Sequence, residues 1–381
     1  MKKTKCLSLI IIIQICISCN SKIQDNDSVS LVDANLDLGY SLDENTKQMI
    51  LAFFPYTDED GKEYITFQNE RKNEILFYDM NSGDFLYKLQ PEYEGPNGVG
   101  RFLGYFIKDL ENIFLTSGLP VISQIEYNGN LKEKYSFANT TTGIPLYEYN
   151  SLSYIYTPIV VIDNNLYITS YCNRLAGTNP VSAVINMNTK EVSALPFEYP
   201  IFEASKNKIF ENNQLESFLS RCYDGKNFIY SFYFDEDIYV ASIDHKTVRK
   251  ISVKSKYISK VQFPNMQTGD PMKNICENPN YGNLYYDPYR KVYYRVAYPE
   301  VNIDKNENFR DLWHYGRKNF SIIILDKDFN IIGETLFPDF TYISTLMFVN
   351  KDGLYISNSH YRNLDYNEDN LNFVCFNLDY K

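Results

Sequence analysis

Two short segments of the chain combine aromatic rings with imidazole and guanidinium groups. Residues 310–317 (RDLWHYGR) contain the only tryptophan and one of the three histidines, and residues 359–362 (SHYR) contain another histidine. Such rings stack on ligands, and guanidinium groups hold carboxylates through paired hydrogen bonds. We therefore predict a site for a glycan, a peptide or a partner protein, with these candidate residues: Arg101, Arg174, Arg310, Trp313, His314, Arg317, His360, Tyr361 and Arg362.

Motifs for catalysis, phosphate binding and metal binding are absent from the sequence. It has no G-x-S-x-G, H-E-x-x-H or Walker motif, and the glycine-rich residues 95–101 (GPNGVGR) lack the Lys-Ser/Thr pair that holds a phosphate. Two acidic loops, residues 304–308 and 365–369, lack the glycine and the final glutamate of a calcium loop. His245 falls in a short turn, where we expect an exposed side chain. We predict no catalytic residue, no metal and no cofactor.

A β-hairpin at residues 319–337 (NFSIIILDKDFNIIGETLF) represents the unit from which the chain is built. Residues 321–325 form a β-branched run too short for a typical helix, residues 326–330 supply turn-forming side chains, and residues 331–337 return as a second strand. Comparable hairpins occur at residues 74–89, 123–137, 182–197 and 237–253 and near the C-terminus. The sequence therefore predicts an all-β fold of repeated units.

The hairpins recur at intervals of roughly 50 to 60 residues, which is the period of a propeller blade. Two further strands precede each hairpin, so each unit has four strands. One interval is longer because residues 261–282 and 300–318 show no strand pattern. We predict a β-propeller with six four-stranded blades, and seven blades remain the main alternative.

The last blade needs a strand from the other end of the chain. Its own sequence supplies only three strands, and an unpaired edge would leave the ring open. Residues 29–38 (VSLVDANLDL) are the natural fourth strand. We expect this strand to close the ring, and we assign residues 31–381 to a single propeller domain.

The composition agrees with this fold class and argues against one class of partner. The chain of 381 residues contains 34 Tyr, 25 Phe and 1 Trp, and aromatic residues favour pleated, half-buried surfaces. Its net charge is −11, with 48 acidic against 37 basic residues. Because proteins bind phosphate backbones through clustered Lys and Arg, we predict no nucleic-acid partner.

The first residues have the layout of an export signal. Three lysines among the first five residues precede an apolar run over residues 7–17, which is shorter than the roughly 20 residues of a membrane-spanning helix. We predict a signal peptide over residues 1–18, lipidation of Cys19 and a flexible tether over residues 19–30. The protein would then be anchored by lipid in the cell envelope, in the outer membrane, facing the periplasm or the surface.

The cysteines that follow the leader are far apart in the sequence. No pair among Cys172, Cys222, Cys276 and Cys375 has the spacing of a metal or redox site. We predict that they are separate core residues, with disulfides or a metal as the alternative.

Three stretches of the chain resemble an uncharacterised family of lipoproteins from gut-dwelling Gram-negative bacteria. They are the lipobox at residues 17–19 (ISC), residues 95–115 (GPNGVGRFLGYFIKDLENIFL) and residues 321–334 (SIIILDKDFNIIGE). The resemblance covers nearly all of the mature chain and implies a six-bladed, TolB-like propeller. It implies no catalytic residue, because the family has no established activity.

Loop lengths differ between the two faces of the predicted propeller. The turns within hairpins are short, whereas the loops between second and third strands and between blades are long, so all long loops meet at one mouth. Most of the candidate residues lie in these loops. We predict a binding or scaffold module that recognises its ligand at the mouth; the alternative is that these residues only pack the loops together. A second functional alternative is a propeller enzyme of lactonase or lyase type.

Overall fold

The computed structural model describes residues 27–48, 50–144, 146, 152–172, 178–203, 214–264 and 270–381. Its strands follow the predicted runs closely. Their bounds are β1 (Val29–Ser41), β2 (Phe53–Thr57), β3 (Glu63–Asn69), β4 (Glu74–Asp79), β5 (Phe85–Leu89), β6 (Gly104–Asp109), β7 (Asn112–Thr116), β8 (Val121–Ile125), β9 (Leu131–Ser136), β10 (Val160–Ile162), β11 (Asn165–Thr169), β12 (Ser182–Asn186), β13 (Val192–Ala194), β14 (Leu219–Tyr223), β15 (Asn227–Phe232), β16 (Asp237–Ser242), β17 (Val248–Ser252), β18 (Asn280–Asp287), β19 (Val292–Tyr298), β20 (Ser321–Leu325), β21 (Ile331–Leu336), β22 (Ile343–Val349), β23 (Leu354–Ser357) and β24 (Asn370–Tyr380).

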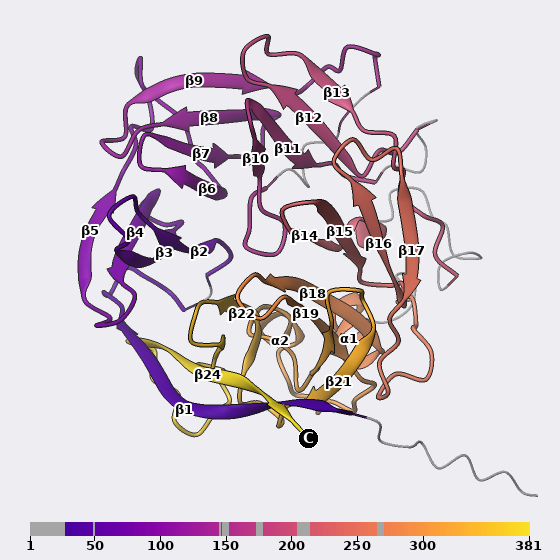
Figure 1. Ribbon diagram of the computed structural model, residues 1–381. Helices are drawn as coiled ribbons and strands as arrows, with labels where there is room; N and C mark the ends of the chain where they lie inside the picture. Colours follow the sequence, from indigo (N-terminus) through magenta and orange to yellow (C-terminus); the bar gives the residue numbers. More distant parts are fainter. Residues whose placement is uncertain are drawn as a thin grey trace, which may run out of the picture.

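Six antiparallel sheets of four strands are arranged around a ring (Figure 1). From the ring axis outwards, blades 1 to 5 are β2–β5, β6–β9, β10–β13, β14–β17 and β18–β21, and blade 6 consists of β22, β23, β24 and β1. The predicted all-β propeller with six four-stranded blades is confirmed. The alternative of seven blades is wrong.

Aspartate side chains shape the turns between the outer strands. After β20, the Asp326 carboxylate oxygen Oδ1 accepts hydrogen bonds from the backbone N–H groups of Asp328 and Asn330, both at 2.9 Å. Asp79 at the end of β4 likewise accepts from two backbone N–H groups at 3.0 Å. An aspartate can close a turn in this way with its own side chain, which is why it marks the hairpins in the sequence.

β1 closes the ring by pairing with β24. The register runs from Val29 opposite Tyr380 to Ser41 opposite Asn370. This pairing gives both strands ladder partners that blade 6 would otherwise lack. The predicted closure is confirmed, and the strand begins at Val29, inside the segment predicted as tether.

Neighbouring blades pack face to face through aromatic and aliphatic side chains. The ring of Tyr40 in β1 makes T-shaped contacts with Phe67 of blade 1 and Phe373 of blade 6, at centroid distances of 5.8 and 6.0 Å. Aromatic pairs of this kind contribute about 0.5–1.5 kcal/mol beyond the burial of their area. The many aromatic residues of the sequence therefore hold the blades to one another.

The four cysteines of the described chain form no disulfide with one another. Three of them, Cys172, Cys276 and Cys375, are buried, and Cys222 is half-buried. The prediction of separate core residues is confirmed for these three buried cysteines, and Cys222 packs against the edge of an apolar cluster.

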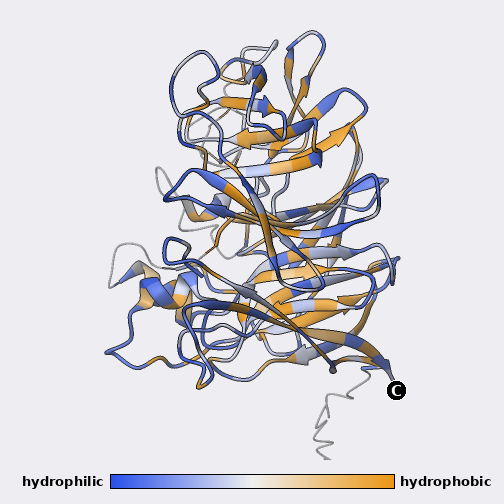
Figure 2. Ribbon diagram, turned by 90° about the vertical axis from the view of Figure 1, so that its left-hand side faces the viewer, coloured by the Kyte–Doolittle hydropathy of each residue, from blue (hydrophilic) through white to orange (hydrophobic). Residues whose placement is uncertain are grey.

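Two short helices lie among the long loops on one face of the ring (Figure 2). They are α1 (Pro271–Glu277) before β18 and α2 (Phe309–His314) between β19 and β20. The side chains of Asp270 and Asn308 cap them, each accepting two backbone N–H groups. The sequence did not predict these helices, because seven and six residues are too few to show a helical period. Within the described ranges, no helix is long and apolar enough to cross a membrane.

The connections sort by face as the sequence predicts. β14 ends at Tyr223 and β15 begins at Asn227, whereas β19 ends at Tyr298 and β20 begins at Ser321. We name the face with the long connections and the helices the mouth face, and the opposite one the turn face. The C-terminus lies at the turn face (Figure 2).

His245 is buried, so the prediction of an exposed turn histidine is wrong. Its side chain is 2% exposed, and its Nε2 atom lies 2.5 Å from the Tyr230 hydroxyl. That hydroxyl also bonds to the Ser182 hydroxyl, which accepts a hydrogen bond from the Arg221 guanidinium. These polar groups lie between blades 3 and 4, and the imidazole in the turn supplies a partner that a buried network requires.

Candidate functional site

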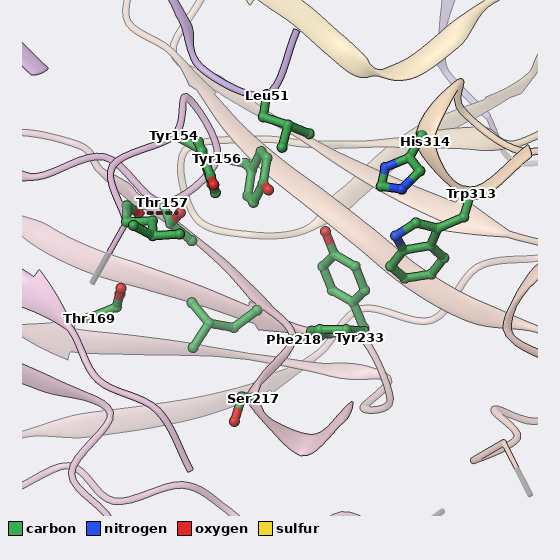
Figure 3. Close-up of a pocket in the computed structure, with 12 residues that line it drawn as sticks. Leu51, Tyr154, Tyr156, Thr157, Thr169, Ser217, Phe218, Tyr233, Trp313 and His314 are labelled. Carbon is green, nitrogen blue, oxygen red and sulfur yellow. Dashed lines mark hydrogen bonds between the residues drawn. The ribbon is translucent and has the colours of Figure 1, made fainter. Parts of the chain in front are cut away.

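A pocket of about 270 Å³ lies where the mouth face meets the ring axis (Figure 3). A smaller cavity of about 80 Å³ shares Tyr156, Tyr233, Trp313 and other lining residues with it and reaches Thr345 of blade 6. The aromatic lining of the larger pocket comes from the segment before β10, the start of β14, the end of β15 and α2. We name the two cavities together the mouth pocket. The aromatic residues that line the larger cavity are Tyr154, Tyr156, Phe218, Tyr233 and Trp313.

Three of the nine predicted residues line the mouth pocket, namely Trp313, His314 and Arg317. They belong to α2 and the turn that follows it. Leu312, just before them, is completely buried and packs against Cys276 of α1 and Ile303, which holds α2 against α1. All three residues follow this buried leucine directly, at the end of α2 and in the turn after it, so Leu312 fixes their position at the mouth.

Trp313 is held between an aromatic ring and a cation. Its ring centroid lies 5.5 Å from that of Phe218, and the guanidinium carbon of Arg317 lies 4.5 Å from its centre. Arg317 is itself buried: it donates a hydrogen bond to the Ile275 carbonyl and lies 4.5 Å from the centre of the Tyr298 ring. The Arg317 charge is thus committed to internal contacts, and the indole is fixed as a wall of the pocket.

Tyrosine hydroxyl groups contribute the polar part of the lining. The Tyr233 hydroxyl donates to Asn283 Oδ1 at 2.7 Å, and the Tyr298 hydroxyl lies 2.8 Å from the Ser344 hydroxyl. Burial raises the pKa of Tyr156 and of Tyr233 well above the usual value, and the neighbouring tyrosines raise it further. These phenols are therefore neutral hydrogen-bonding groups at physiological pH.

His314 adds a neutral imidazole. Burial lowers its pKa, and the nearby Arg310 cation lowers it further. No aspartate or glutamate occurs among the described residues that line the mouth pocket. The pocket therefore combines flat aromatic surfaces with uncharged donors and acceptors (Figure 3).

The segment before β10 forms the floor of the pocket and plugs the ring axis. The Tyr105 N–H of blade 2 donates to the Ser153 carbonyl at 3.2 Å, and the Arg221 N–H of blade 4 donates to the Tyr156 carbonyl at 2.7 Å. Ile155, between these two points, packs against three of the apolar clusters of the ring. The segment is therefore fixed by hydrogen bonds from two blades, and it carries Tyr154 and Tyr156 into the pocket.

The three predicted residues after β23 lie behind α2 rather than in the pocket. His360 is completely buried, with its Nε2 atom 3.1 Å from the Arg317 carbonyl oxygen, and burial lowers its pKa to about 4. The Tyr361 hydroxyl donates to Glu307, and Arg362 forms an ion pair with the same carboxylate. These residues pack the loops together, which is the structural alternative left open by the sequence.

The remaining predicted residues do not reach the pocket. Arg310 is exposed on α2, and Arg101 is exposed in the connection between β5 and β6, where it lies 3.5 Å from Glu70. Arg174 and the predicted lipidation residue Cys19 lie outside the described residues.

The tyrosines and Phe218 were missed by sequence reasoning, which looked for rare residue types in long loops. Phe218 directly precedes β14, Tyr233 directly follows β15, and Tyr298 ends β19. In a propeller, the start of the first strand and the end of the second both lie at the mouth. An aromatic residue at either position is therefore a usable signal, even in a chain with 34 tyrosines.

Two solved structures are similar to this chain over most of its length. One, a DUF4221 family member from Bacteroides vulgatus, has a TM-score of 0.80 and 27% identity, covering 93% of this chain and 100% of that one. The other, a Bacteroides fragilis protein described as exported, has a TM-score of 0.53 and 9% identity, covering 93% and 96%. Among curated proteins, none matches.

The family resemblance found in the sequence is confirmed for the fold, and its lipoprotein part stays a prediction. The profile of DUF4221, a domain of unknown function, matches residues 28–336. That range is more than half of the chain, and the protein therefore belongs to the DUF4221 family.

Proposed function

We propose that this protein is an exported, lipid-anchored binding module whose mouth pocket takes an uncharged ligand with a flat apolar face, such as a sugar ring. The observation that carries the proposal is the lining of the pocket, where aromatic rings from several connections form the walls and their phenol, indole and imidazole groups supply hydrogen-bond donors and acceptors. A sugar ring offers C–H groups that pack on aromatic faces and hydroxyl groups that exchange hydrogen bonds with such donors and acceptors.

The preference for an uncharged ligand follows from the charges around the pocket. In the described lining, Arg317 is the one side chain with a permanent charge, and it is bonded to the Ile275 carbonyl and stacked between Trp313 and Tyr298. A ligand carboxylate would have to compete for a guanidinium that is already desolvated and engaged. A neutral sugar or amide meets no such competition.

Export and anchoring are supported by the leader. The charged, apolar and small-residue regions of residues 1–18 and the cysteine that follows them are typical of a lipoprotein signal. The similar protein from Bacteroides fragilis is described as exported. A binding module held at the cell envelope would capture ligand from the surroundings or present it to a partner.

A glycan array with matched variants tests the proposal. Wild-type protein should bind a subset of neutral glycans, and Trp313→Ala should weaken that binding by 10-fold or more, since a stacking wall is lost. Phe340→Ala is the control, because Phe340 also packs under an arginine in the same loop cluster but lines neither cavity of the mouth pocket. Equal binding by both variants, or binding confined to acidic glycans and peptides, would reject the proposed ligand class.

Mass spectrometry of the recovered ligand separates binding from catalysis. A binding module returns the ligand unchanged after prolonged incubation. Cleavage or elimination in the ligand, lost in Trp313→Ala and retained in Phe340→Ala, would assign the pocket to an enzyme of lactonase or lyase type instead. Metal analysis of the same sample shows whether such turnover depends on a bound ion.

A further inference from the structure

The ring axis has a second opening, at the turn face. It is a pocket of about 580 Å³, and the innermost strands of all six blades line it. Each blade contributes at least one side chain to the lining; in order from blade 1 to blade 6, examples are Phe54, Phe106, Val161, Cys222, Tyr285 and Phe348. We name it the turn-face pocket.

This pocket is closed at its inner end. Ile155 lines it, whereas the neighbouring Tyr154 and Tyr156 line the mouth pocket. The plug described above therefore separates the two, with Ile155 as the floor of the turn-face pocket. A molecule that enters from the turn face meets an apolar end wall and cannot pass through the ring.

The charged group at this opening is already satisfied by the protein. Asp224 Oδ1 accepts hydrogen bonds from the backbone N–H groups of Lys226 and Asn227 at 2.8 and 2.6 Å. Its Oδ2 accepts from the Tyr293 hydroxyl at 2.8 Å and from the Asn227 side-chain amide at 3.5 Å. With four donors around it, this carboxylate offers little to a ligand except repulsion of an anion.

We infer that the turn-face pocket binds an uncharged, lipophilic small molecule. Its volume lies within the range of about 300–1,000 Å³ found for ligand pockets, and its lining is predominantly apolar. Apolar cavities hold water poorly and accept apolar ligands readily. The walls are strands of a closed ring, so the pocket is preformed, and binding requires little rearrangement. This site is separate from the mouth pocket and does not rest on the function proposed for it.

The start of β1 lies at the same face as this opening, so the predicted lipid anchor before β1 lies on that side too. The Ser28 N–H donates to the Ile332 carbonyl at 3.1 Å, and Ile332 follows the turn between β20 and β21, so β1 begins at the turn face. Cys19 precedes Asp27 by eight residues, a distance of at most about 29 Å when fully extended. A lipid anchor at Cys19 would hold the turn face close to a membrane, where uncharged lipophilic molecules concentrate.

Titration with the neutral fluorophore N-phenyl-1-naphthylamine tests this inference. The protein is the full chain with Cys19→Ala, purified without detergent. We expect saturable binding near one molecule per chain, and at least 10-fold weaker binding in Val161→Phe and in Val349→Phe, which fill the pocket from opposite blades. The control is Val248→Phe, a half-buried valine on the outer strand β17 that does not line the pocket. Decanol should displace the probe, and decanoate at pH 8 should not.

Several results would overturn the inference. One is undiminished probe binding in both Val161→Phe and Val349→Phe. Another is a failure of the wild-type protein to bind the probe saturably. Displacement by decanoate as effective as by decanol would reject the uncharged class. A dimer in analytical ultracentrifugation that Val161→Phe and Val349→Phe both abolish would assign the opening to a second copy of the chain. Two variants on opposite walls guard against misfolding of one of them.

Discussion

The guanidinium carbon of Arg317 lies 4.5 Å from the centre of the Trp313 ring, so the wall of the mouth pocket and the packing of the loops depend on the same contact. Arg317 is 4% exposed, while Trp313 is half-buried and faces the pocket. A cation held against an aromatic face away from water contributes up to about 2 kcal/mol. A substitution at either residue should therefore lower both the free energy of unfolding and the affinity for a ligand of the mouth pocket.

We predict that Arg317 and Trp313 are energetically coupled. Arg317→Met should lower the free energy of unfolding by roughly 2–4 kcal/mol, because it leaves the Ile275 carbonyl without its partner and removes the charge from between two rings. In the double variant with Trp313→Ala, the loss in free energy of unfolding should be smaller than the sum of the two single losses by about 1 kcal/mol. Urea denaturation of the four proteins measures this.

Arg310→Met provides the control for that cycle. Arg310 is exposed on the same helix, so we expect a change within about 0.5 kcal/mol and additivity with Trp313→Ala. Strict additivity between Arg317→Met and Trp313→Ala would show that the stacking contributes no free energy.

We predict a loss of stability as the pH falls from about 6.5 to about 4, owing to two buried histidines. Burial lowers the pKa of His245 and of His360 to about 4 in the fold, whereas an unfolded chain binds a proton near pH 6.5. Above pH 6.5 both states hold neutral rings; below it only the unfolded state gains the proton, so the free energy of unfolding falls. At about 1.4 kcal/mol per pKa unit, each histidine costs roughly 3 kcal/mol by pH 4.

Denaturation curves at a series of pH values check this prediction. His245→Gln should reduce the fall in stability between pH 6.5 and 4 relative to the wild type. His314→Gln should change it less, because His314 is only half-buried. A pH profile for His245→Gln parallel to that of the wild type would mean that carboxylates alone cause the acid sensitivity.

Deletion of residues 29–38 should destabilise the whole domain. β1 pairs with β24 along most of its length and also packs on β21 of blade 5, so its removal opens the ring and exposes two blades. Deletion of residues 21–26, which precede the described chain, should leave the melting temperature nearly unchanged. Equal melting temperatures for the two deletions would contradict closure by β1.

Cys19→Ala should release the protein from membranes. The signal pattern makes Cys19 the point of lipid attachment, and stable anchoring requires more than one acyl chain, so loss of the modified cysteine should remove nearly all membrane affinity. Fractionation after a high-salt wash measures the distribution. A variant that still sediments with membranes would show that the protein is held there by another route.

The architecture could be predicted from the sequence because its determinants are local. The aspartate turns after the third strand of several blades, the β-branched runs beside them and the regular spacing each reflect nearby residues. Ring closure followed from the single unmatched strand in residues 29–38. The helices were missed because each is held by one capping side chain and tertiary packing instead of a periodic apolar face.

The site could be predicted only in part, because burial is a property of the fold. Trp313 and His360 are similar in the sequence, each a rare residue in a long loop. One lines the pocket and the other lies beneath Arg317. His245 shows the same limit, since its short turn gives no hint of the Tyr230 hydroxyl between the blades. The tyrosines of the mouth pocket were hidden by their abundance.

The pairing of β1 with β24 also sets the order in which the molecule can be completed. β1 is among the first parts of the fold to leave the ribosome, and its partner is the last strand to be made. Until then β1 has no ladder partner, and it must stay free of other strand edges while the other five blades assemble. A chaperone that shields nascent strands during synthesis and export would therefore matter more for this first strand than for any strand whose partner follows it directly.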